Sequence, residues 1–136
     1  MIYMATAVTK STMAALNTAY ELKYVAATAD TDGPDAGCAE EFTFTPSTAR
    51  GLLIVDAVGP AVATATKDIT VAFSAGTLWA SKAISAIATK AKATVIEVDT
   101  GAVKGSAGLV TVTLTPGTGD KLKSDHLCKV AFVEII

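Results

Sequence analysis

Apolar and polar residues alternate in short stretches along most of the chain after residue 40. In a β-strand, alternation of this kind turns every second side chain toward a core and the others toward water. Each stretch ends at residues that favour turns, among them Pro46, Gly59-Pro60 and Pro116-Gly117. The pattern predicts six strands, over residues 41–45, 51–56, 69–73, 93–98, 109–114 and 129–135.

Short strands at such close spacing are typical of an all-β fold, and we expect a two-sheet β-sandwich of the jelly-roll or immunoglobulin-like kind. The stretch 51–56 is almost continuously apolar, which indicates a central strand. Alternate residues of a strand share one face, so a set of apolar side chains should lie in the core between the sheets. These are Ile69, Val71, Phe73, Val110, Val112 and Leu114. The composition agrees, since 51% of the residues are hydrophobic, with much Ala and Val and many Thr beside them.

Residues 81–91 fit two interpretations. As an Ala-rich helix, the segment would place Ile84, Ile87 and Ala91 on one face. As a strand, it would end in a turn at Thr89-Lys90 and pair with the strand that begins at residue 93. We favour the strand, because a hairpin closes more simply over so short a distance.

The first 25 residues show no regular alternation, although several of them are apolar. We interpret residues 1–25 as an extended N-terminal arm and residues 26–136 as a single sandwich domain. One helical turn after Ser11 is an alternative within the arm, since a hydroxyl there can cap free N–H groups. The residues between Val25 and Glu40 are rich in Ala, Asp, Gly and Thr, which predicts a loop.

Charge and hydropathy narrow the classes of partner. The chain has 11 basic and 13 acidic residues, for a net charge of −2, and Arg50 is its single arginine. Without a basic stripe it lacks the footprint of nucleic-acid binding. No apolar run approaches the roughly 18 residues that span a bilayer, and no cleavable leader is visible. We expect a protein made in the cytoplasm that binds neither nucleic acid nor membranes.

The one histidine, His126, follows Ser124 and Asp125 and precedes Cys128. Three consecutive residues do not make the geometry of a catalytic triad, and a Cys–His metal pair would need further ligands from elsewhere. We expect a turn here, with no catalytic residue, no cofactor and no enzymatic activity. Cys38 and Cys128 are far apart and not in a metal or redox spacing, so we expect two free thiols.

An acidic loop carries carboxylates at Asp30, Asp32 and Asp35 around Gly33. It has part of the pattern of a calcium-binding loop but lacks the Glu that completes the ligand set, unless a Glu at the end of the loop reaches back. We interpret the loop as a solvated surface without a metal. A weak calcium site is the alternative.

Four side chains are candidate anchors for a partner protein. Residues 1–22 combine apolar groups with no alternation, which a monomer has little reason to keep on its surface. We expect Tyr3, Leu16 and Tyr20 to pack on a neighbouring subunit, where large side chains contribute most of the binding energy. Trp79, in a predicted loop, is either a core residue or a fourth anchor.

Several stretches, spread over most of the chain, follow one another in a recognisable order. They are residues 4–12, which read Met-Ala-Thr-Ala-Val-Thr-Lys-Ser-Thr, and residues 16–22, 41–46, 53–55, 69–71, 95–104 and 129–134. This order resembles that of small structural proteins of tailed bacteriophages, which are typically encoded near the major capsid protein. Among them it is most similar to head-decoration or cement proteins.

The resemblance implies a β-sandwich that binds the outer surface of an assembled capsid and bridges neighbouring subunits. Its partners would be the major capsid protein and, in a homo-oligomer, further copies of the chain, and its location would be the virion. Two other functions use the same fold class: a phage tail or baseplate component, and a secreted carbohydrate-binding or adhesive module. The missing leader and the few aromatic candidates argue against the secreted module.

Overall fold

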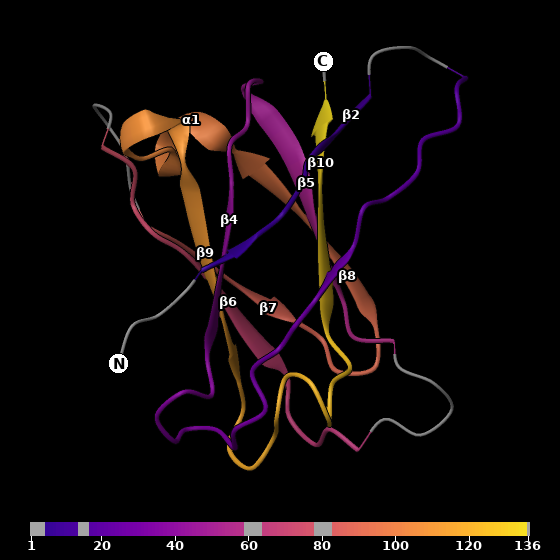
Figure 1. Cartoon of the computed structure of the whole chain (residues 1–136), viewed down its shortest axis with the longest axis vertical. Coiled ribbons are helices and arrows are strands. Elements are labelled where there is room, and N and C mark those ends of the chain that lie inside the picture. The colour runs from indigo at the N-terminus through magenta and orange to yellow at the C-terminus, as the bar shows by residue number, and fades with distance from the viewer. Residues whose placement is uncertain (1–4, 14–16, 59–63, 78–82, 136) are drawn as a thin grey trace.

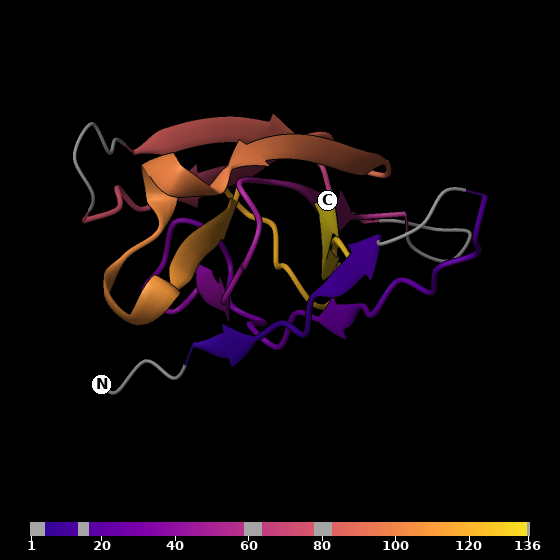
Figure 2. The ribbon, with the colours of Figure 1, turned by 90° about the horizontal axis from the view of Figure 1, so that it is seen from above.

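The computed structural model describes residues 5–13, 17–58, 64–77 and 83–135, in which two β-sheets lie face to face (Figures 1 and 2). Sheet A has the strand order β1 (Thr6–Ala7), β4 (Glu40–Phe44), β9 (Val110–Pro116), β6 (Ile69–Phe73) and β7 (Ile84–Ala88). Sheet B has the order β2 (Ser11–Met13), β10 (Lys129–Ile135), β5 (Arg50–Asp56) and β8 (Ala93–Asp99), with β3 (Val25–Ala26) also beside β10. The expected all-β two-sheet sandwich is confirmed.

The strands of 69–73 and 129–135 match their predicted bounds, and the other four differ from prediction by one or two residues at their ends. The apolar run of β5 is a central strand as expected, since it lies between β10 and β8. A short helix, α1 (Thr100–Val103), and a 3₁₀ turn (Ser106–Gly108) connect β8 to β9. The side chain of Asp99 caps α1 by accepting a hydrogen bond from Gly101 N at 3.0 Å.

The core lies between the two sheets. All six side chains predicted to fill it are at most 1% exposed: Ile69, Val71, Phe73, Val110, Val112 and Leu114. The rings of Phe44 from sheet A and Phe132 from sheet B stack with their centroids 4.1 Å apart. One apolar core therefore joins the two sheets.

The favoured strand within residues 81–91 is also confirmed, although residues 81 and 82 lie outside the described part of the chain. Ile84–Ala88 forms β7, and a turn leads from it into β8. Within β7, Ala88 is buried whereas Ile87 is 55% exposed. Neighbouring residues thus point to opposite sides, as in a strand, and the helical face of Ile84, Ile87 and Ala91 does not form.

The N-terminal segment takes part in both sheets, which the sequence did not predict. β1 pairs with β4 and β2 pairs with β10, both in parallel, and Val8 between them is only 6% exposed. Ser11 begins β2, so the alternative of a helical turn after Ser11 is wrong. β3 lies where the expected arm meets the expected loop before Glu40, and it pairs with β10.

The two lateral sides of the sandwich are closed differently (Figure 2). On one side the N-terminal segment crosses from β1 in sheet A to β2 in sheet B. On the opposite side β7 and β8, joined by their turn, are the last strands of the two sheets. The termini of the described chain therefore lie near the side formed by β4 and β10.

Candidate docking surface

The outer face of sheet A is lined mainly by hydroxyl groups. Along β4, β6, β7 and β9, alternate residues point into the core, and the residues between them point outward. Six of the nine outward residues are Thr or Ser; the nine are Glu41, Thr43, Thr70, Ala72, Ser85, Ile87, Thr111, Thr113 and Thr115. Short hydroxyl side chains are well solvated, so this face is suited to contact with water.

The outer face of sheet B is aliphatic at its centre. Ile54 lies between Val95 and Ala131 in the register of the sheet, and Leu52 lies beside Val133. We use the name aliphatic face for Leu52, Ile54, Val95, Ala131, Val133 and Ile135. Because the core takes the alternate residues of the same strands, these six side chains are not part of the core.

Exposure differs across the aliphatic face. Ala131 and Val133 on β10 are 1% and 4% exposed, although their register turns them outward. On the neighbouring strands, Leu52 and Ile54 are half-buried and Val95 is 56% exposed. The aliphatic face is therefore buried over β10 and accessible to solvent over β5 and β8.

Charged pairs stand at both ends of the aliphatic face. At one end Arg50 Nε donates to Glu97 Oε1 at 2.9 Å, and at the other Lys129 Nζ lies 3.9 Å from Asp56 Oδ2. Lys129 Nζ also lies 4.5 Å from the centroid of the Tyr24 ring. Burial, followed by the nearby Asp56 carboxylate, raises the pKa of Tyr24. An apolar centre with a polar rim is the usual composition of a protein–protein interface.

The predicted anchors are only partly placed. Tyr3, Leu16 and Trp79 lie outside the described residues, and Tyr20 is half-buried in the segment between β2 and β3. Tyr24, which the sequence did not single out, is the aromatic residue next to the charged rim. Its position just before β3 follows from the pairing of Val25 with Val130, and this pairing leaves no signal in the sequence.

Two buried carboxylates hold the N-terminal segment, and the sequence did not single out either of them. Glu134, whose side chain is 0% exposed, lies 2.8 Å from Lys10 Nζ. Its two oxygens also accept hydrogen bonds from Ser47 N at 2.7 Å and Ser47 Oγ at 2.9 Å. Glu40, which is 6% exposed, accepts from Thr6 Oγ1 at 2.9 Å. The segment is thus fixed by polar contacts in β1 and directly before β2.

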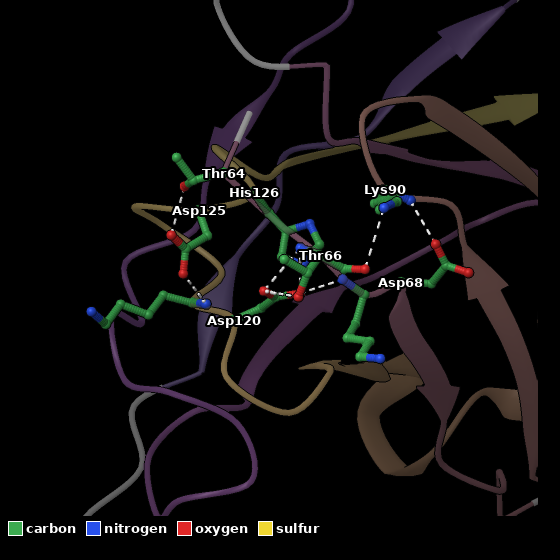
Figure 3. A network of polar contacts seen from close by, with 9 residues as sticks. Thr64, Thr66, Asp68, Lys90, Asp120, Asp125 and His126 are labelled. Carbon is green, nitrogen blue, oxygen red and sulfur yellow. Dashed lines mark hydrogen bonds and ion pairs between the residues drawn. The ribbon is translucent and has the colours of Figure 1, made fainter. Parts of the chain in front are cut away.

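The segment around His126 forms a turn before β10, and its polar residues have separate partners (Figure 3). Asp125 accepts from Thr64 Oγ1 at 2.7 Å and from Lys121 N at 2.8 Å. Ser124 donates from its backbone N–H and its hydroxyl to Asp30. Ser124, Asp125 and His126 therefore do not converge on one reacting atom in the way a catalytic triad does.

His126 itself is 0% exposed, and its Nε2 lies 3.5 Å from Asp120 Oδ2. Neither ring nitrogen makes a hydrogen bond within the described part of the chain. Asp120 instead accepts from the backbone N–H groups of Thr66 and Lys67, at 3.0 and 2.7 Å (Figure 3). Burial lowers the pKa of His126, and the carboxylates of Asp120, Asp125 and Asp68 oppose that shift without cancelling it.

The acidic loop contacts the same turn. Asp30 accepts from Ser124 N at 3.0 Å, and Asp32 lies 3.7 Å from Lys121 Nζ. Among residues 5–13, 17–58, 64–77 and 83–135, no group of three or more His, Cys, Asp or Glu side chains is arranged to hold a metal ion. Asp35 contributes its carbonyl to a turn that ends at Cys38 N. In this structure the loop joins the N-terminal half of the chain to the turn before β10.

The two cysteines are buried and not bonded to each other. Burial raises the pKa of the Cys128 thiol to about 12, so this thiol stays protonated at neutral pH. A protonated, buried thiol is a poor nucleophile and a poor metal ligand. In the described part of the chain, no helix is both long and apolar enough to cross a membrane.

Comparison of the chain with protein-family models, with curated proteins and with solved structures found no match.

Proposed function

We propose that the chain is a structural protein of a bacteriophage virion, which binds the outer surface of the capsid and bridges neighbouring capsid subunits. The resemblance of its motifs to head-decoration proteins supports this proposal. The observation that carries it is the difference between the two outer faces: the aliphatic face of sheet B has a charged rim, whereas the outer face of sheet A is hydroxylic. In this account the aliphatic face contacts the major capsid protein and sheet A faces the solvent.

The size of the aliphatic face is consistent with binding to a repeating lattice. The two strands over which the face is exposed, β5 and β8, have seven residues each and cover roughly 200 Å², at about 4.8 Å between strands and about 3.3 Å per residue. A stable interface usually buries about 800 Å² on each partner. One such contact is weak, so stable attachment requires a second contact on a neighbouring subunit.

The test compares binding of two double variants to capsids assembled from the major capsid protein of the same genome. Ile54→Asp with Val95→Asp places two charges on neighbouring strands of the aliphatic face. Ala72→Asp with Thr113→Asp is the matched control, since these two residues are paired neighbours on the outer face of sheet A. Co-sedimentation measures binding, and circular dichroism with thermal unfolding checks that both variants are folded.

We expect the Ile54/Val95 variant to bind at least tenfold more weakly than the parent, a loss of about 1.4 kcal/mol or more. The Ala72/Thr113 variant should bind like the parent. Loss of binding in the control variant with binding retained in the Ile54/Val95 variant would contradict the assignment of faces. Binding to purified tails and not to capsids would contradict the capsid as the binding partner. It would favour a tail component.

A further inference from the structure

The N-terminal segment, residues 5–13, pairs with β4 of sheet A and with β10 of sheet B. Val8 enters the core at its centre, and its N–H donates to Thr43 O at 2.8 Å. On one side of Val8, Thr6 donates to Glu40, and on the other, Lys10 Nζ contacts Ser47 Oγ at 3.0 Å and Glu134 at 2.8 Å. We call this set of receiving groups on the sandwich the segment groove.

The segment groove is unstable when empty. The Glu134 side chain is fully buried, and Lys10 is the one cation within ion-pair distance of it among the described residues. A buried carboxylate that loses its cation destabilises the fold, because its charge is left uncompensated. Loss of the segment would also expose the apolar site of Val8. Each sandwich therefore needs a bound segment with a lysine at this position.

Nothing in the groove requires that segment to come from the same chain. The groups that receive it, among them Glu40, Thr43, Ser47, Val133 and Glu134, all belong to the sandwich beyond residue 39. Ser11 Oγ does bond within its own N-terminal region, to Glu21 O at 3.1 Å. Residues 14–24 connect β2 to β3, and such a connection spans up to about 40 Å when extended. In Figure 2 its described part, residues 17–24, starts away from the sandwich and runs inward to β3.

We infer that the segment groove of one copy accepts residues 5–13 of a second copy, so that neighbouring copies are joined by exchange of this segment. The contacts made in exchange are the same ones that the single chain shows. The equilibrium between the monomer and the exchanged form therefore depends on the local concentration of other copies. The partner is thus a second copy of this chain, recognised by the lysine and the apolar residue that its segment carries. This inference concerns contacts between copies and does not depend on which assembly the protein binds.

A disulfide test distinguishes exchange from binding within one chain. Ala7 and Thr43 are paired residues of β1 and β4, so cysteines at these positions are at bonding distance. Ala7→Cys and Thr43→Cys are made in separate, differently tagged full-length chains. The two chains are mixed in denaturant, refolded together at high protein concentration and oxidised. The matched control pairs Ala7→Cys with Thr113→Cys, because Thr113 also faces outward but lies one strand further away, on β9.

We expect a disulfide-linked heterodimer from the Ala7/Thr43 pair, at several times the yield of the control pair. The parent chain, which keeps only its buried cysteines, should give none. Equal yields from the Ala7/Thr43 and Ala7/Thr113 pairs would overturn the inference. It would also be overturned if the refolded mixture remains monomeric at every concentration while a double variant, with both cysteines in one chain, closes its disulfide internally.

Discussion

Glu40, Asp120 and Glu134 are buried acidic residues that accept hydrogen bonds from backbone N–H groups of segments outside the strands. Glu40 Oε1 accepts from Thr28 N and Ala29 N, both at 2.7 Å. The carboxylates of Asp120 and Glu134 do the same for residues 66–67 and for residue 47. Burial alone would raise the pKa of Asp120 and Glu134, but these bonds and nearby positive charge hold both below their usual values. At the residue scale, buried carboxylates fix the irregular parts of the fold.

Removal of Lys10 tests the buried pair with Glu134. Lys10→Ala leaves a fully buried carboxylate with only its bonds to Ser47, and we expect the free energy of unfolding to fall by about 2 kcal/mol. Glu134→Gln added to Lys10→Ala should recover part of that loss, because the uncompensated charge is gone. Chemical denaturation measures both, with Lys123→Ala at an exposed position as the control. A Lys10→Ala variant as stable as the Lys123→Ala variant would contradict this role.

The buried His126 gives a prediction about pH. Its pKa is lowered from 6.5 in the folded chain, so the unfolded chain takes up the proton first as the pH falls. The burial of neutral His126 therefore leaves the free energy of unfolding at its full value above pH 6.5. Below that pH the free energy of unfolding declines, by at most about 1.4 kcal/mol per pH unit for one proton. Unfolding free energies measured from pH 7.5 to 5.5 should show this decline in the parent and not in His126→Gln. The same decline in both proteins would exclude His126 as its source.

At the scale of elements, long strands were predictable from the sequence and short ones were not. Residues 69–73 and 129–135 alternate long enough to show their period, and both strands form as expected. β1, β2 and β3 have two or three residues each, too few for a period, and their partners lie far along the chain. The burial of Glu134 was predictable from the sequence. Glu134 alternates with Val130 and Phe132 along β10, so it lies on the same, inward face of the strand.

The packing of β5 against β10 predicts the effect of a glycine substitution. A Cβ atom at Gly51 would overlap the ring of Phe132, which covers this position. We expect Gly51→Ala to lower the free energy of unfolding by about 1 to 3 kcal/mol, the usual cost of overpacking a core. Phe132→Leu removes the ring edge, so Gly51→Ala should cost less in that background than in the parent. A double-mutant cycle by chemical denaturation measures the difference, and strict additivity would contradict the contact.

At the scale of the whole molecule, the two sheets have one shared core and two unlike outer faces. The apolar stretches of β5 and β10 indicate that sheet B has two apolar faces, since a strand that is apolar on both sides is covered on both sides. The sequence does not predict what covers the outer face of sheet B, because that depends on how β5, β8 and β10 come together. Three of the four predicted anchors, Tyr3, Leu16 and Trp79, lie outside the described residues and stay predictions.

The most direct test of the central claim is a cryo-electron microscopy reconstruction of the virion that carries this protein. We predict sandwich-shaped density on the outer surface of the capsid, with Ile54 and Val95 of sheet B facing the capsid lattice and the Thr-rich face of sheet A facing the solvent. Density with sheet A against the lattice would contradict the assignment of the docking surface. A particle in which the chain occupies only the tail, or is missing from the virion, would contradict the proposed function.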